Sequence, residues 1–267
     1  MELVELKQSQ LEMVPVTGAA ELFVGSLVEW SGEGVDLIDI ASGALDTTGE
    51  TIIAGLVIGT NNETKVYEDG TTVAGFAGEE ITGLVTQAGL VGRTQFGNRG
   101  MYPKGEKLAM VEIAIIDCTT RIRAPIYNAA FGTAPTLLTV TAGSTDGLGC
   151  TTNAADAAGV ADLSTLYFRS GVNAGAYRVT DDASSTVHTN DHPFTRDISI
   201  GDTGVKVNLK HGFCRVQFDA AGLYINCGAA LTADYYGIIV DYIDLRTAGK
   251  EFCEFRFIPK HFGTPIA

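Results

Sequence analysis

The fold is decided by three apolar runs between Thr51 and Ile116, namely IIAGLVIG (52–59), ITGLVT (81–86) and KLAMVEIAII (107–116). Each run is short, rich in β-branched residues and closed by Gly, Asn, Asp or Pro, which is typical of strands joined by tight turns. No helical pattern of comparable strength occurs elsewhere in the chain. These runs therefore predict an all-β protein.

A hairpin is predicted between the first and second of these runs. The segment YEDGTTV (67–73) places Asp69-Gly70 between two strand-like arms. A type I′ turn needs positive φ at both central residues, and Asp-Gly is among the pairs that supply it most readily. We therefore expect two antiparallel strands around this turn.

The last third of the chain alternates apolar and polar residues in three segments, 205–210, 214–218 and 253–257. Such alternation is typical of antiparallel sheets with one face buried and the other in water. The segment 235–245 is apolar on both faces apart from Asp241 and Asp244, which indicates a central strand. Short strands separated by frequent turns favour an antiparallel β-sandwich or a jelly-roll-like domain.

The texture of the sequence changes after Ile116 and suggests two domains. We expect an N-terminal arm at 1–20, a small barrel-like or β-tulip-like domain at 21–116, a linker at 117–136 and a β-sandwich domain at 137–267. The linker is placed by an irregular stretch that contains Arg121, Arg123, Pro125 and Pro135. Residues 142–163, rich in Gly, Ala, Ser and Thr, predict a long loop or a weak helix.

The charge balance excludes some classes of partner. The chain of 267 residues has 18 basic and 32 acidic side chains, for a formal net charge of −14. Binding to nucleic acid or to an anionic membrane would need a concentrated basic surface, and none is visible. The apolar runs are shorter than the roughly 20 residues that span a bilayer, and the start lacks a signal-peptide pattern. We expect a soluble protein made in the cytoplasm.

The cysteines indicate reduced thiols, because they are odd in number, far apart and free of any C-x-x-C pair. Cys214 and Cys253 lie on the apolar side of alternating segments, where a buried thiol behaves as a small hydrophobe. The other three are Cys118, Cys150 and Cys227.

One short motif matches a catalytic signature. Asp202-Thr203-Gly204 has the form seen in aspartic proteases, where two aspartates share a proton and activate water. It lies between two strand-like segments, and Gly201 and Gly204 make a good β-turn. A second aspartate could come only from a symmetric partner, so we interpret the motif as a turn.

A second candidate is metal binding. His188 and His192 are spaced i, i+4, which on a helix would direct both imidazoles to one zinc ion. The residues around them, 189–193, predict a loop instead, and a site would need Asp191 or Asp197 as a further ligand.

Two further possibilities remain. Asp181, Asp182 and Asp244 could contribute to a calcium site, although no EF-hand pattern is present. The aromatic residues Trp30, Tyr224, Tyr235, Tyr236 and Tyr242 could stack on sugars or on a partner chain, but packing is the favoured interpretation. We therefore assign no catalytic, cofactor-binding or metal-binding residue, and expect no cofactor.

Several segments resemble proteins of bacteriophage virions. The runs 22–30 and 53–59, followed by YPKGEK (102–107), are similar to the small β domains of tailed-bacteriophage capsid decoration (cement) proteins. The segments 175–180 and 201–205 resemble β domains of phage virion proteins generally. The likeness covers the first 116 residues in outline and lies in the general pattern of the sequence, not in an invariant motif.

The resemblance implies a non-enzymatic virion structural protein that docks on the outside of a capsid and stabilises it. Its implied partners are the major capsid protein and its own copies, as a homotrimer, with no nucleic acid and no membrane. The implied location is the capsid surface, after synthesis in the host cytoplasm. The alternatives are a tail-tube or head-fibre component, a carbohydrate-binding β module and a metal-dependent hydrolase that uses His188 and His192.

Overall fold

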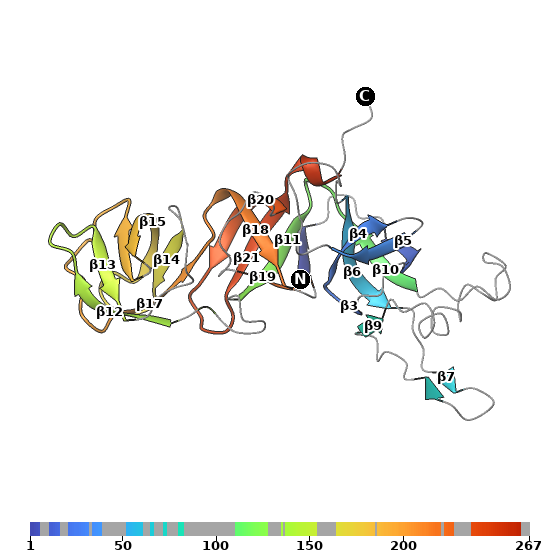
Figure 1. Ribbon diagram of the computed structural model, residues 1–267, viewed down its shortest axis with the longest axis horizontal. Helices are drawn as coiled ribbons and strands as arrows, with labels where there is room; N and C mark the ends of the chain where they lie inside the picture. The colour runs from blue at the N-terminus through green and yellow to red at the C-terminus, as the bar shows by residue number, and fades with distance from the viewer. Residues whose placement is uncertain are drawn as a thin grey trace. The chain divides into compact units, whose positions relative to one another are not determined.

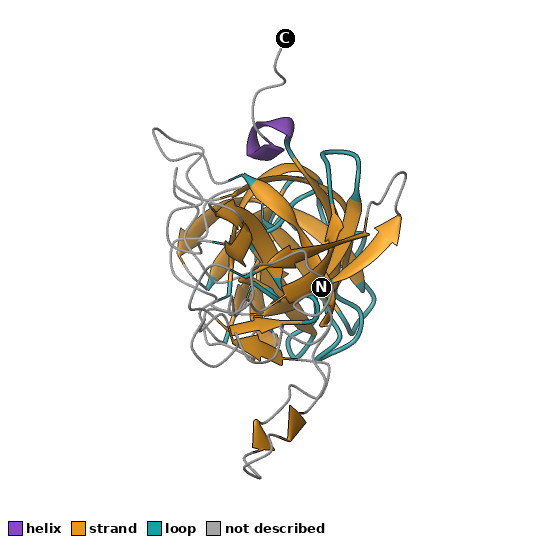
Figure 2. Ribbon diagram, turned by 90° about the vertical axis from the view of Figure 1, so that its right-hand side faces the viewer, coloured by secondary structure: helices purple, strands orange, loops and turns teal. Residues whose placement is uncertain are grey.

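The computed structural model confirms the all-β prediction. The residues that it describes are 1–5, 11–16, 21–31, 34–38, 52–60, 65–66, 72–73, 80–82, 110–127, 135, 137–153, 164–184, 186–219, 222–226 and 236–262. Within these ranges the chain forms strands and loops, and the one helical element is a short 3₁₀ turn, η2 (Pro259–Phe262) (Figure 2).

The chain divides into two compact units (Figure 1). Unit 1 consists of Met1–Ile122, Ala220–Leu223 and Pro259–Ala267, and unit 2 of Arg123–Asp219 and Tyr224–Ile258. Unit 2 is thus built from chain that leaves unit 1 and returns to it twice.

Unit 1 is organised around a five-stranded sheet in the order β2 (Leu11–Pro15), β10 (Met110–Ile115), β6 (Ile53–Thr60), β4 (Leu27–Ser31) and β5 (Gly34–Leu37). A single bridge between Val16 and Val35 joins the two ends of this sheet. The sheet therefore curls into a barrel-like form, as the sequence predicted. The remaining strands are β1 (Glu2–Glu5), the pair β3 (Glu21–Phe23) and β9 (Glu80–Thr82), and the pair β7 (Lys65–Val66) and β8 (Thr72–Val73).

The core of unit 1 is aliphatic. Val28, Val57 and Val111 are fully buried in a cluster that six further aliphatic side chains complete. Gly55 is required where β6 crosses β10, because a Cβ at this position would collide with the carbonyl oxygen of Ala114. Gly25 has φ +95° and interrupts the segment 22–30 between β3 and β4. A side chain is also excluded there, because a Cβ would come within 2.6 Å of the Met1 nitrogen.

Two expectations for the first half can be compared with the strands. β7 and β8 pair antiparallel, which confirms two antiparallel strands on either side of Asp69-Gly70, whereas the predicted turn itself falls within residues 67–71, outside the described residues. Part of the expected N-terminal arm is instead β2, which pairs with β10 along five residues. The segment 102–107 also lies outside the described residues.

The expected linker contains a regular strand, β11 (Arg121–Tyr127). Ile122, Ala124 and Ile126 are at most 1% exposed, whereas the residues between them are half-buried. The prediction of an irregular stretch was wrong because Arg121, Arg123 and Pro125 occupy the outward positions of an ordinary alternating strand, although the boundary between the units, after Ile122, lies within 117–136.

Unit 2 contains a closed six-stranded barrel, which we call the barrel. Its order is β12 (Leu137–Gly143), β13 (Gly149–Thr152), β16 (Val187–Asn190), β15 (Gly175–Ser184), β14 (Thr165–Phe168) and β17 (Thr203–Val207), and β17 pairs again with β12. The sequence favoured a sandwich or jelly roll for this region. Register shifts in the β12–β13 and β15–β16 pairs mark bulges, which bend a sheet and help it to close.

Two local predictions in the barrel were wrong. Lys206 and Asn208 were expected on a solvated face, but both are less than 10% exposed. The segment from His188 to Asn190 was expected in a loop, but it pairs with β13 and β15 as part of β16. The alternation Val187-His188-Thr189-Asn190 is a strand pattern whose inward positions are polar.

Unit 2 also contains a second closed set of strands, which we call the ring. Its order is β11, β19 (Ile225–Asn226), β18 (Gly212–Phe218), β20 (Tyr236–Asp244) and β21 (Phe252–Phe257), and β21 pairs with β11. Its core holds Phe218, Tyr236, Phe255 and Phe257, each at most 1% exposed and in mutual ring contact. β20 lies between β18 and β21, so its prediction as a central strand is confirmed.

Candidate functional site

The candidate site is a pocket of about 280 Å³ in unit 2. Its walls come from β14 and β15 of the barrel, from the segments that follow β16 and β17, and from the end of β20. Its polar and aromatic lining includes Tyr167, Arg178, Asp191, Lys210 and His211, and Ile243 and Leu245 supply an apolar wall.

The strand register places Tyr167 and Arg178 on neighbouring strands of the outer face of the barrel, in diagonal positions. In the β14–β15 pair, Thr165 lies opposite Arg178 and Tyr167 lies opposite Ala176. Leu166 is buried in the barrel core, and successive side chains of a strand point to opposite faces. Tyr167 therefore faces outward, and the small side chain opposite it leaves room beside its ring.

The turn that carries Lys210 is fixed by hydrogen bonds. The Thr165 hydroxyl donates to the carbonyl oxygen of Leu209 at 2.6 Å. The Lys210 amide donates to the Cys214 sulfur at 3.2 Å, and the Cys214 thiol lies 3.1 Å from the Lys210 carbonyl oxygen. Burial raises the pKa of Cys214, so the group remains a thiol that can donate. These contacts set the backbone from which the Lys210 ammonium extends.

The opposite rim is formed by Asp191 and His192. The Asp191 amide donates to the carbonyl oxygen of Arg178 at 2.9 Å, which attaches the rim to β15. His192 Nδ1 lies 2.8 Å from the Asp191 carbonyl oxygen. The Asp191 side chain is 31% exposed, and its Oδ2 lies 4.0 Å from His192 Nε2, so the carboxylate remains partly accessible from the pocket mouth.

The two cations of the pocket differ from four arginines elsewhere in unit 2. Among the side chains that the structure describes, neither Arg178 nor Lys210 forms an ion pair with an acidic residue. Four other arginines of unit 2 are paired, as Arg123–Glu254, Arg169–Glu251, Arg246–Asp244 and Arg256–Asp241. The pocket therefore concentrates unpaired positive charge in a protein whose formal net charge is −14.

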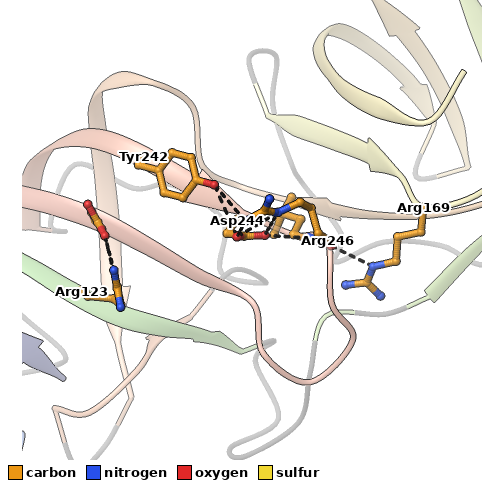
Figure 3. A network of polar contacts seen from close by, with 7 residues as sticks. Arg123, Arg169, Tyr242, Asp244 and Arg246 are labelled. Atoms are coloured by element: carbon orange, nitrogen blue, oxygen red, sulfur yellow. Dashed lines mark hydrogen bonds and ion pairs between the residues drawn. The ribbon is translucent and has the colours of Figure 1, made fainter.

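Figure 3 shows three of the paired arginines, Arg123, Arg169 and Arg246, with Tyr242 and Asp244. Arg246 contacts the Asp244 carboxylate through Nε at 3.0 Å, and the Tyr242 hydroxyl reaches the same carboxylate at 3.4 Å. Hydrogen bonds from Arg246 hold the pKa of Asp244 below its usual value. Arg169 donates through Nε to the Leu245 carbonyl oxygen at 2.8 Å and also pairs with the Glu251 carboxylate. These arginines hold the backbone beside the pocket in place.

The structure does not bring the two histidines of the zinc hypothesis together. His188 is fully buried in the barrel, where its Nε2 lies 3.2 Å from the Thr152 hydroxyl. His192 is at the pocket rim, with a side chain 82% exposed. Across the described residues, no group of three or more His, Cys, Asp or Glu side chains is placed to hold a metal ion.

The interpretation of Asp202-Thr203-Gly204 as a turn holds for Asp202 alone, because Thr203 and Gly204 belong to β17. The Asp202 amide donates to the Ser199 carbonyl oxygen at 3.1 Å, Gly201 has φ +97°, and β17 starts at Thr203. Asp202 is 7% exposed and its carboxylate packs over Gly171, where any Cβ would collide with it. Its role is to close a turn.

The remaining sequence candidates are placed as follows. The side chains of Asp181 and Asp182 lie outside the described residues, and Asp244 is paired with Arg246. Tyr236 packs in the ring core, whereas Trp30 and Tyr242 are 41% and 40% exposed. Cys150, Cys214 and Cys253 are buried free thiols, and burial raises the pKa of Cys150 to about 12.

Sequence reasoning missed the pocket residues Tyr167, Arg178 and Lys210. They come from three separate segments that only the barrel register assembles.

Comparison with protein-family models, with curated proteins and with solved structures found no match. Within the described part of the chain, no helix is long and apolar enough to cross a membrane.

Proposed function

We propose that the protein is a non-enzymatic structural component of a virion, of the capsid decoration type. Unit 1 would dock on the major capsid protein, and copies of the chain would associate as a homotrimer. Unit 2 would be the additional module that such a protein carries on its docking domain.

The observation that carries this proposal is the path of the chain. The first 122 residues and two later segments of the chain form a small curled β unit. The stretches of sequence between these segments form a second β unit. This arrangement supports a base unit with an inserted module. Cyclic association could also cover strand edges that are otherwise open to pairing.

Unit 1 offers an exposed apolar pair that suits docking. Trp30 and Ile52 are 41% and 38% exposed, and the Trp30 amide donates to the Ile52 carbonyl oxygen at 2.9 Å. Tryptophan is enriched among the residues that dominate interface energies. We therefore expect Trp30 to lie within the surface that contacts the capsid.

The test is the presence of the chain in purified virus particles, measured by peptide mass spectrometry. A stoichiometric amount on the capsid is expected, and its absence from the particles would refute the proposal. Trp30→Ala should weaken rebinding to particles stripped of the protein by roughly thirtyfold or more, as for interface residues worth about 2 kcal/mol. Ile200→Ala, an exposed apolar change in unit 2, is the matched control and should bind normally.

A further inference from the structure

We propose that the pocket of unit 2 binds an acidic saccharide, with the sugar carboxylate at Arg178 and Lys210 and the sugar ring against Tyr167. This inference specifies the ligand class of a carbohydrate-binding module and does not depend on incorporation into a virion.

The charge of the pocket indicates an anionic ligand. Arg178 and Lys210 both line it with a single acidic residue, Asp191, and neither cation forms an ion pair with a described acidic side chain. Guanidinium groups bind carboxylates through two parallel hydrogen bonds, and an ammonium adds a compact charge with three donors. A ligand carboxylate would supply the partner that these two cations lack within the described residues.

The aromatic and apolar walls indicate a sugar ring. Tyr167 faces outward and lines the pocket, with Val205 opposite it on β17 and the small Ala176 opposite it on β15, so a flat ligand can approach its ring from the Ala176 side. Tyrosine presents a large apolar face at low entropic cost, and its hydroxyl gives a polar end. Leu245 and Ile243 complete a wall on which the C–H groups of a sugar can rest.

Asp191 separates a saccharide from a phosphate ester. Its partly exposed carboxylate on the rim can accept hydrogen bonds from sugar hydroxyls. The same carboxylate would repel a doubly charged phosphate, because like charges at short range are unfavourable. A ligand with one negative charge and several hydroxyls, such as a uronic acid, satisfies both ends of the pocket.

The size and the rigidity of the pocket agree with one sugar residue of a longer chain. Its volume of about 280 Å³ is near the lower end of the range of roughly 300–1,000 Å³ that ligand pockets occupy. The bonds from Thr165 to Leu209 and between Lys210 and Cys214 hold one cationic wall in place before the ligand arrives. Such preorganisation reduces the entropy lost on binding.

The test is ligand-observed NMR on the full chain with a glucuronic-acid disaccharide, a neutral glucose disaccharide of the same linkage, and inorganic phosphate. The acidic disaccharide should bind with a Kd of about 1 mM or tighter, and the neutral one roughly tenfold more weakly. Equal binding of the two disaccharides, tighter binding of phosphate, or no binding of the acid up to about 10 mM would overturn the proposal.

Variants localise the site. Arg178→Gln should weaken binding of the acidic disaccharide roughly tenfold and leave the neutral one unchanged, whereas Tyr167→Ala should weaken both. Lys250→Gln removes an exposed cation of unit 2 outside the pocket and should change neither. An unaltered affinity for the acid in Arg178→Gln, with native folding shown by circular dichroism, would contradict the assignment. Particle incorporation is measured without sugar, so failure here leaves the virion proposal standing.

Discussion

The ring packs four aromatic side chains at its centre, whereas the barrel places a histidine, an asparagine and a threonine beside a core that includes the aromatic cluster Phe168, Tyr177 and Phe194. In the ring, Phe218 lies within 5.5 to 6.1 Å of three other aromatic rings. In the barrel, His188 and Asn190 lie opposite Cys150 and Val179, which belong to the barrel core. Two sheets with similar strand lengths therefore have interiors of different chemistry.

This difference indicates that the ring and the barrel have different roles within unit 2. Close-packed aromatic rings bury large apolar areas and add specific edge contacts, so the ring is expected to supply much of the stability. The barrel carries the outer face that forms the pocket, and its interior is less fully optimised. Substitutions in each core, and at ion pairs outside the two cores, test this contrast.

The largest effect is expected in the ring core. Phe218→Ala should lower the free energy of unfolding by about 3–5 kcal/mol, because it removes a fully buried ring and leaves a cavity. Urea unfolding of purified protein measures the loss. Ile200→Ala, at a side chain 77% exposed in the same unit, should change the value by less than about 0.5 kcal/mol. A loss at Phe218 no larger than in this control would contradict the contrast.

The next effect concerns the ion pair between Arg169 and Glu251. Arg169→Met should lower the free energy of unfolding by about 3 kcal/mol, because the Glu251 side chain is 1% exposed and would keep an unpaired charge. The double variant Arg169→Met with Glu251→Gln should recover much of this loss, since the buried charge is then gone. Equal urea midpoints for the single and double variants would show that the charge is not the cause.

A change of opposite sign is expected in the barrel core. Asn190 is 3% exposed, and neither of its side-chain polar atoms has a hydrogen-bond partner in the described structure. Asn190→Leu should therefore raise the free energy of unfolding by about 1 kcal/mol. Asn173 is equally buried, but its amide bonds Thr195 and Arg196, so Asn173→Leu should destabilise by about 1–3 kcal/mol. Similar losses in both variants would refute the prediction.

The smallest effect is a pH dependence beside the ring. Because hydrogen bonds from Arg246 lower the pKa of Asp244 in the folded state, its contribution to stability is present above the unfolded pKa. It is lost as the pH falls through the lower, folded value. The difference in unfolding free energy between the native protein and Asp244→Asn should be constant near neutrality and shrink below about pH 4. A difference that stays constant down to about pH 2 would exclude this linkage.

Much of the fold follows from local patterns in the sequence. Two strands were predicted from such patterns, β18 from the alternation at Cys214, Val216 and Phe218, and β20 from its apolar run on both faces. In both strands the apolar residue types mark the buried positions. The strand β11 was missed because its outward positions hold Arg and Pro. The closure of the barrel was missed because it depends on bulges and on pairing between distant segments, which leave no local signal.

The candidate site was less predictable. Tyr167 and Arg178 are adjacent only through the β14–β15 register, and Lys210 joins them through a turn fixed by Cys214. The sequence directed attention to His188 and His192, whose spacing has meaning on a helix. On β16 and the bend that follows it, one histidine is buried and the other faces solvent.

The measurement that most directly tests the proposed role is native mass spectrometry of the purified full chain, since one spectrum reports both the oligomeric state and any bound metal. A virion protein that assembles with its own copies should give a closed, metal-free oligomer, with the trimer as the expected species. A monomer would contradict this account. A monomer that carries a stoichiometric metal ion would in addition favour the hydrolase hypothesis.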